Sequence, residues 1–281
     1  MRLRTLPVSV AGVIAAGAYA VIYGAFSPVV AILCLMFAVL AQIASNFANE
    51  YFDYRDGLDR PGREGPRRGV TEGDISPRSM LFAAIITVGL ACCIGLVIAW
   101  IGGLWLIALG VLIALGVFAY SAGPYPLSRH ALGEVAVIFF FGIIPVTLTF
   151  YVMSGFCTWH VVAGSVAVGL MGANVLLVNN YRDAPDDASV GKTTLVVKWG
   201  RKAASTIYLF NGYVAVALMV DVWFSMPRGW RLVPIAYLMI HTMLWHRITL
   251  VRGRALNPML GITAMLMLAY AIFFFAASIW I

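Results

Sequence analysis

The sequence predicts an all-α integral membrane protein, a bundle of about nine transmembrane helices in which residues 1–281 form a single polytopic domain. Three observations predict this class. Hydrophobic residues make up 62% of the chain and charged residues only 11%, whereas soluble domains are about half apolar and a quarter charged. Many apolar stretches reach the roughly 20 residues needed to cross about 30 Å of hydrocarbon. The charged residues gather in the short segments between these stretches.

Nine apolar stretches account for most of the chain. The first is long enough to remain in the membrane, so we do not interpret it as a cleaved signal peptide. Prolines and glycines inside the stretches fit membrane helices, because neighbouring groups can satisfy the freed backbone. The predicted spans are residues 5–26, 29–53, 79–100, 103–122, 132–153, 160–182, 203–223, 231–248 and 257–280.

The basic residues predict the orientation of the chain. With the N-terminus placed inside, all of the 19 Lys and Arg except Arg228 and Arg231 fall on one side. Basic loops favour the cytoplasmic face, so the N-terminus and the charged loops are predicted to be cytoplasmic in a multi-pass protein of the cell membrane. The net charge of +7 follows from this topology and does not indicate nucleic-acid binding.

The acidic residues are as one-sided as the basic ones, and topology does not explain them. Of the 12 Asp and Glu, only Asp221 lies on the far side. Ten of the 12 form two clusters, which end the second and the sixth predicted spans. Asparagines precede the acids of each cluster, and a basic loop follows them. This pattern predicts a weak internal repeat of four helices that brings two similar sites together.

The first cluster places amides and carboxylates on one helix face. At 100° per residue, four of its positions fall within about 80° of arc. Gly57 is predicted to end the helix, which leaves Asp59 on the loop beyond it. The residues on the shared face are Asn46, Asn49, Asp53 and Asp56.

The second cluster repeats this arrangement. Asn180, Asp183 and Asp187 share a face if the helix continues through Pro185, whereas Asp187 lies on a turn if Pro185 ends the helix. Oxygen ligands at this spacing suit Mg²⁺, which binds a few carboxylates together with phosphate oxygens. Two such helix ends facing each other predict a Mg²⁺ and diphosphate site at the cytoplasmic mouth of a cavity, where nearby basic side chains such as Lys192 contact the phosphates.

Five segments, spread over nearly the whole chain, carry recognisable motifs. They are Arg4 to Pro7, Gln42 to Asp59, Gly65 to Val70 with Gly73 to Ser76, Tyr120 to Leu127 with Leu132 to Val135, and Asn179 to Asp187 with Gly191 to Leu195. Together and in this order they resemble the UbiA superfamily of membrane prenyltransferases, and the most similar branch is that of the 1,4-dihydroxy-2-naphthoate polyprenyltransferases of menaquinone synthesis. One departure is Glu50, where the family usually has Asp; position 50 points away from Asn49 and Asp53, which we rank above it.

The resemblance implies a Mg²⁺-dependent reaction of a polyprenyl diphosphate with 1,4-dihydroxy-2-naphthoate that releases CO₂ and diphosphate. The metal would stabilise the departing diphosphate, and aromatic rings would shield the allylic cation. The predicted metal ligands are Asn49, Asp53, Asp183 and Asp187. The predicted catalytic residues are Asp53, Asp59, Asp183, Asp187 and Tyr120, with Tyr151 a weaker candidate for the shield. The predicted diphosphate ligands are Arg68, Arg182, Lys192, Asn46 and Asn180.

Other interpretations stay open at this point. The acceptor could be another aromatic acid, such as hydroxybenzoate or homogentisate. An ion-coupled transporter also carries acids in repeated helices, although its sites usually lie near mid-bilayer. A CDP-alcohol phosphotransferase would carry the motif Asp-Gly-x-x-Ala-Arg, whereas Asp56-Gly57 continues here as Leu-Asp-Arg. In the prenyltransferase interpretation, an apolar groove takes the insoluble prenyl tail from the lipid bilayer.

Overall fold

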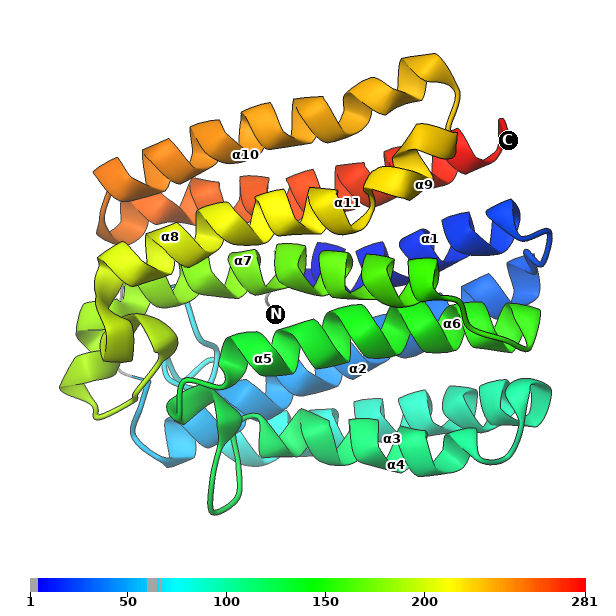
Figure 1. Cartoon of the computed structure of the whole chain (residues 1–281). Coiled ribbons are helices and arrows are strands. Elements are labelled where there is room, and N and C mark those ends of the chain that lie inside the picture. The colour runs from blue at the N-terminus through cyan, green and yellow to red at the C-terminus, as the bar shows by residue number, and fades with distance from the viewer. Residues whose placement is uncertain (1–4, 60–64, 66) are drawn as a thin grey trace.

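A computed structural model describes residues 5–59, 65 and 67–281, and its regular secondary structure is helical throughout these residues. This confirms the predicted all-α class. The long helices lie side by side along one direction (Figure 1). In chain order the helices are α1 Leu6–Ile22, α2 Pro28–Arg55, α3 Pro77–Gly102, α4 Leu106–Ala119, η2 Leu127–Arg129, α5 Gly133–Val137, η3 Ile138–Ile143, α6 Ile144–Ser154, α7 Trp159–Ser189, α8 Leu195–Leu218, α9 Val220–Ser225, η4 Arg228–Leu232, α10 Val233–Leu250, η5 Gly253–Leu256 and α11 Asn257–Ser278.

Local sequence sets where several helices begin. The Ser76 hydroxyl accepts a hydrogen bond from the Ser79 N–H at 3.1 Å, and Pro77 occupies the first helical position of α3. Thr158 and Thr194 cap α7 and α8 in the same way. A capping oxygen satisfies one of the backbone N–H groups that the first turn leaves without a partner, and proline has no such group to satisfy.

Two helix boundaries differ by seven or eight residues from the predicted spans. The sixth predicted span ends at 182, whereas α7 continues through Pro185 to Ser189. The seventh begins at 203, whereas α8 begins at Leu195 and bends at Gly200, where φ is +81°. In both places polar residues extend a helix beyond the apolar stretch, so hydropathy alone does not report its length.

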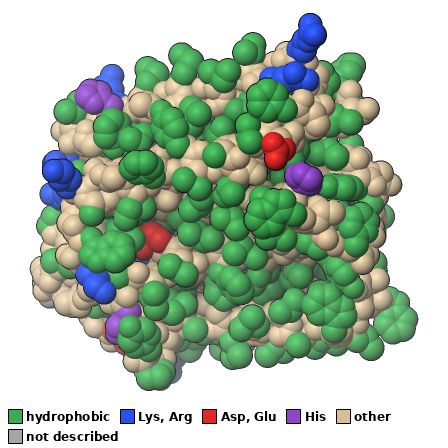
Figure 2. All heavy atoms as spheres, viewed as in Figure 1, with side chains coloured by type: hydrophobic (Ala, Val, Ile, Leu, Met, Phe, Trp, Pro, Cys, Tyr) green, Lys and Arg blue, Asp and Glu red, His purple; other side chains and the backbone are tan. Residues whose placement is uncertain are grey.

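Within the part of the chain that the structure describes, five helical segments are long and apolar enough to cross a membrane: α2, α3, α5 to α6, α7, and η5 to α11. Two shorter apolar helices, α1 and α4, accompany them. On the face shown in Figure 2, hydrophobic side chains cover the middle, and Lys and Arg lie at its left end and upper right corner. The chain is therefore a multi-pass membrane protein, while the number of nine spans stays a prediction.

Helix α7 lies at the centre of the bundle and is the most buried of the long helices. It packs along α8 on one side and against η3 on the other, while α1 packs along α11 and α2 along α3. Gly142 of η3 touches the backbone of Gly169 and Ser165 in α7 so closely that a Cβ has no room. Small residues allow membrane helices to approach in this way, and the approach fixes η3 against α7.

Candidate active site

The acidic ends of α2 and α7 lie at the same end of the bundle, on the left in Figure 1. The connections at this end include residues 67–76, 120–132 and 190–194. The second and third are tied together, because the Ala131 N–H donates to the Thr193 carbonyl at 2.8 Å. Arg129 ties the second to α2 by donating to Asp56 at 2.6 Å. Hydrogen bonds from Arg55 and Arg129 hold the pKa of Asp56 below its ordinary value, so this tie stays charged at neutral pH.

A polar cavity of about 120 Å³ lies between α2 and α7. Asn46, Asn49 and Asp53 line it from α2, and these are three of the four positions predicted to share one face. Asn179 and Asn180 line it from α7. Side chains of both predicted clusters therefore meet at one cavity. The other polar residues in its lining are Thr5, Gln42, Ser45, Tyr120, Ser121, Ser128 and Lys192.

Hydrogen bonds orient the amide groups of α2. Asn46 donates to the Thr5 hydroxyl at 3.2 Å and accepts from Gln42 at 3.3 Å, so both ends of its amide are bonded within the protein. Asn49 Oδ1 accepts a hydrogen bond from the Ser121 hydroxyl. Asn46, which was predicted to bind diphosphate, uses its amide to hold α1 against α2, whereas the NH₂ group of Asn49 is left for the cavity.

Arg68 is a buried cation between two acids of the first cluster. Its guanidinium lies 3.4 Å from Asp53 and 3.2 Å from Asp59. Its Nη1 group is buried and has no hydrogen-bond partner within the residues that the structure describes. Glu50 faces the loop instead, where its carboxylate accepts from the Val70 N–H at 3.1 Å. Arg68 is therefore suited to a phosphate oxygen, and Glu50 to holding the loop.

The second cluster stays helical to its end. Pro185 does not break α7, so Asp187 lies on the helix rather than on a turn. The Lys192 N–H donates to the Asp187 carbonyl at 2.9 Å, and the Lys192 ammonium lies 3.3 Å from the Asp187 carboxylate. These contacts hold Lys192 against the end of α7 and bring it into the lining of the polar cavity.

Arg182 is held by partners inside the protein. Its Nε and Nη2 atoms donate to the two carboxylate oxygens of Asp183 at 2.7 and 2.8 Å. It also donates to the side-chain oxygens of Asn179 and Asn257, each at 2.8 Å. The guanidinium was predicted to bind diphosphate, but it lies outside the cavity lining, where it orients Asp183 and joins α7 to α11.

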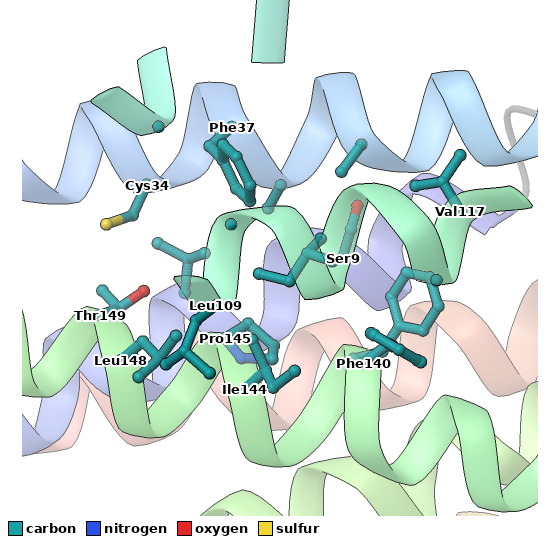
Figure 3. A pocket seen from close by; sticks show the side chains of 18 of the residues that line it. Ser9, Cys34, Phe37, Leu109, Val117, Phe140, Ile144, Pro145, Leu148 and Thr149 are labelled. Atoms are coloured by element: carbon teal, nitrogen blue, oxygen red, sulfur yellow. The ribbon is translucent and has the colours of Figure 1, made fainter. Parts of the chain in front are cut away.

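An apolar cavity of about 140 Å³ adjoins the polar one. Apart from the hydroxyls of Ser9 and Thr149 and the thiol of Cys34, the side chains labelled in Figure 3 end in carbon. The two cavities have several lining residues in common, so they lie next to each other. The shared residues are Ser45, Tyr120, Val137 and Phe141.

The π-helical turn η3 keeps one face of the α5 to α6 segment toward the apolar cavity. Lining residues recur in this segment at every fourth position, from Ala136 to Val152. In a regular α-helix, side chains at every fourth position would turn away from the cavity by about 160° over these 16 residues. The wider turn of η3 offsets most of this rotation. The lining residues from this segment are Ala136, Val137, Phe140, Phe141, Ile144, Pro145, Leu148, Thr149 and Val152.

Comparison with known proteins identifies the family. The model of the UbiA prenyltransferase family matches residues 10–258. The chain belongs to this family. The 1,4-dihydroxy-2-naphthoate octaprenyltransferase of Mycobacterium tuberculosis is 35% identical over 96% of this chain and 92% of its own length. The protein of the same name from Escherichia coli is 36% identical over 78% of this chain and 74% of its own. These matches confirm the resemblance seen in the five segments.

Solved UbiA structures share the fold. A UbiA homolog from Aeropyrum pernix superposes with a TM-score of 0.74 at 19% identity and covers 99% of this chain and 98% of its own. A homolog from Archaeoglobus fulgidus, solved with DMAPP and Mg²⁺, gives a TM-score of 0.64 at 18% identity, with 98% of each chain covered. At these identities the likeness establishes the arrangement of the helices in this UbiA member.

The polar cavity of this UbiA protein offers one carboxylate, that of Asp53. Asn49 turns its NH₂ group to the cavity, because its oxygen accepts from Ser121. Among the residues that the structure describes, no three His, Cys, Asp or Glu side chains form a metal-binding group. Mg²⁺ typically takes few protein ligands and completes its shell with water and phosphate oxygens, so the Asp53 carboxylate fits an ion bound together with a diphosphate.

The predicted site residues divide into two groups. Asn46, Asn49, Asp53, Tyr120, Asn180 and Lys192 line the polar cavity. The others are buried outside that lining, in ion pairs, and they are Asp59, Arg68, Arg182, Asp183 and Asp187. Their individual roles stay predictions.

Several residues at the site were not singled out from the sequence. Ser121 bonds Asn49, and Ser128 and Asn179 line the cavity. Ser121 and Asn179 lie in segments that resemble the family, and that was the only available signal. Tyr151, in contrast, lines neither cavity and packs edge to face against Trp105, with 5.2 Å between ring centroids.

Proposed function

We propose that this chain transfers a polyprenyl group from a polyprenyl diphosphate to 1,4-dihydroxy-2-naphthoate in a Mg²⁺-dependent reaction. The products are a prenylated naphthoquinol, CO₂ and diphosphate. One observation carries the proposal: a polar cavity between two Asn- and Asp-bearing helices lies next to an apolar cavity, with Tyr120 in the wall of both. A polyprenyl diphosphate has a charged head and an apolar tail, so it needs a polar and an apolar space side by side. The relatives named above are named as 1,4-dihydroxy-2-naphthoate octaprenyltransferases.

The α2 side of the polar cavity is suited to the diphosphate. Bound Mg²⁺ would act as a Lewis acid that stabilises the leaving diphosphate, with Asp53 as its carboxylate ligand and Asp183 and Asp187 nearby. Arg68 and Lys192 carry positive charge at the same end. Asn49 turns its NH₂ group toward the space in which phosphate oxygens would lie. Together these groups offset the negative charge that develops on the departing diphosphate.

The apolar cavity is suited to the prenyl tail. Tyr120 lines both cavities, so its ring would lie beside the first carbons of the tail, where an allylic cation would form. Farther along, the walls visible in Figure 3 are Leu109, Ile144 and Leu148. An apolar wall excludes water from the reacting carbon and prevents hydrolysis of the cation.

We place the reaction at the cytoplasmic face of a cell membrane, in a single polytopic domain spanning residues 1–281. The support is the uneven distribution of Lys and Arg, since the acid clusters lie on the side that carries all but two of them. The tail would enter from the lipid bilayer, and the diphosphate and the aromatic acid would come from the water side.

Mg²⁺ removal tests the proposal directly. Purified protein, an octaprenyl diphosphate and 1,4-dihydroxy-2-naphthoate are expected to yield a prenylated, decarboxylated product by mass spectrometry. Excess chelator is expected to abolish product, and added Mg²⁺ to restore it. Hydroxybenzoate and homogentisate serve as competing acceptors. Product from one of these alone would assign a different acceptor, and activity unaffected by chelation would contradict the metal-dependent mechanism.

Gly110→Phe is expected to shorten the prenyl chain that the protein accepts. Gly110 lines the apolar cavity about 15 Å along α4 from Tyr120, and an added Cβ meets no atom within 4 Å, so a ring would project into the space for the tail. We expect roughly a tenfold loss of kcat/KM with octaprenyl diphosphate and little change with dimethylallyl diphosphate.

Gly89→Phe is the matched control for this substitution. Gly89 of α3 also has no atom within 4 Å of an added Cβ, but it lines neither cavity. The control is expected to treat both donors as the unmodified protein does. An equal loss with short and long donors in Gly110→Phe would show that the tail does not pass this glycine.

A further inference from the structure

Glu134 is a buried acid that pairs with Asn180 at the edge of the polar cavity. Its side chain lies in the first turn of α5, and the residue is 6% exposed. Its Oε1 atom accepts from the Asn180 amide at 2.9 Å. Its Oε2 atom is buried without a hydrogen-bond partner within residues 5–59, 65 and 67–281. The Lys192 ammonium lies within electrostatic range of the carboxylate.

The position of Glu134 is fixed by its neighbour. A Cβ added to Gly133 would lie 3.1 Å from Leu176 and 3.4 Å from the Tyr120 hydroxyl, so the first turn of α5 is packed closely against both. Tyr120 lines both cavities, and Leu176 lines the polar one. The pair of Glu134 and Asn180 therefore lies near the wall that the two cavities share.

The pairing determines which end of the Asn180 amide faces the cavity. A carboxylate oxygen accepts hydrogen bonds, so it selects the NH₂ group of Asn180 as its partner. The amide oxygen is then the atom available to the cavity that Asn180 lines. An amide with its two ends exchanged has nearly the same shape, so without Glu134 nothing in this contact would select one orientation over the other.

The surroundings of Asn180 differ from the α2 wall, where Asp53 and Arg68 lie. The nearby α7 positions in the lining are Gly172, Val175 and Leu176. Val8 of α1 and Leu260 of α11 extend this apolar wall. Val8 and Val137 pack against Gly172, so this wall is apolar, and no acid lines it. This side of the cavity suits a flat aromatic ring, with polar groups only at its edge.

We propose that Glu134 is a positioning residue that aims the Asn180 amide oxygen at a hydroxyl group of the aromatic acceptor. The inference rests on the proposed function and adds to it the subsite that recognises the acceptor. A hydroxyl donates its hydrogen to the amide oxygen, and this bond holds the ring near the wall that both cavities share. An acceptor lacking that hydroxyl would leave a buried oxygen without a donor.

Glu134→Gln tests the inference. The introduced amide can present either an oxygen or an NH₂ group to Asn180, so the Asn180 amide oxygen is no longer held toward the cavity. We expect the KM for 1,4-dihydroxy-2-naphthoate to rise about tenfold or more, with the KM for polyprenyl diphosphate and the Mg²⁺ requirement changed less than about twofold. Asn180→Asp alone is also expected to weaken acceptor binding, because two carboxylates would meet.

The double variant Glu134→Gln with Asn180→Asp exchanges donor and acceptor across the pair. It returns an oxygen to the cavity, so it is expected to recover most of the lost acceptor affinity. If Glu134 only stabilised the fold, the second substitution would not restore acceptor binding. The double variant can therefore test the inference even if Glu134→Gln alone folds poorly.

Competitive inhibition gives a second readout. The inhibitors are 1-hydroxy-2-naphthoate and 4-hydroxy-2-naphthoate, each with 2-naphthoate as the hydroxyl-free control. The unmodified protein is expected to prefer one hydroxy acid over 2-naphthoate, and Glu134→Gln to lose that preference. A shift in the KM for polyprenyl diphosphate without a shift for the acceptor would overturn the inference, as would failure of the double variant. Absence of any prenylated naphthoate from the unmodified protein would instead contradict the proposed function.

Discussion

Asp53→Ala is expected to lower turnover by on the order of a thousandfold while the protein remains folded. Asp53 lies in the wall of the polar cavity and carries the carboxylate nearest to the proposed diphosphate position. Its loss does not leave Arg68 without a counter-charge, because Asp59 lies 3.2 Å from the same guanidinium. Product formation and the thermal unfolding temperature in detergent would separate loss of chemistry from loss of structure.

Glu50→Gln is the matched control. Glu50 lies one turn earlier on α2 and is about as buried as Asp53, but its carboxylate accepts from the Val70 N–H instead of facing the cavity. We expect Glu50→Gln to be milder than Asp53→Asn, with at most about a tenfold loss, because a glutamine oxygen can still accept that bond. Equal losses from the two substitutions would contradict the assignment of the α2 faces.

Arg182→Met is expected to destabilise the protein by about 3–5 kcal/mol. The substitution leaves the Asp183 carboxylate, whose side chain is 2% exposed, without the guanidinium that now contacts both of its oxygens. Asn179 and Asn257 lose a donor at the same time. The unfolding temperature of the detergent-solubilised protein should fall sharply, and activity should fall with it because α7 no longer holds Asp183.

Arg55→Met tests whether burial is the cause. Arg55 and Asp56 are also adjacent residues, and their Nε–Oδ1 distance is 2.7 Å, as in the pair of Arg182 and Asp183. The Arg55 side chain is 51% exposed, however, so water replaces the lost contact. The expected change is within about 1 kcal/mol. A similar loss of stability from both substitutions would show that the pairing itself, rather than its burial, sets the cost.

The helical face of the first cluster was predictable because helical periodicity is a local property. Positions 46, 49 and 53 do line one cavity, as 100° per residue requires. Asp56 belongs to the same predicted face, but it lies at the C-cap of α2 and pairs with Arg55 and Arg129. Periodicity gives the direction of a side chain, whereas the partner that it meets there depends on the other helices.

Arg182 and Asn46 illustrate what periodicity left undecided. Both were predicted to bind diphosphate because they lie within the polar clusters. Arg182 bonds Asn257, 75 residues away, and Asn46 bonds Thr5, 41 residues away. These partners come from α11 and from the residue before α1, so both side chains join helices that are far apart in the chain, and their contact with diphosphate stays a prediction. No pattern within a single helix could distinguish this use from ligand binding.

The amino-acid sequence alone determined the all-helical membrane class, the approximate helix limits and the gathering of acids at one end, because apolar length, capping residues and charge act locally. Only the tertiary structure decided that Asn180 pairs with Glu134, that Asn49 pairs with Ser121, and that Tyr120 lines both the polar and the apolar cavity. These features depend on how closely the helices pack, and that distance follows from contacts such as Gly142 on Gly169, which are far apart in the chain.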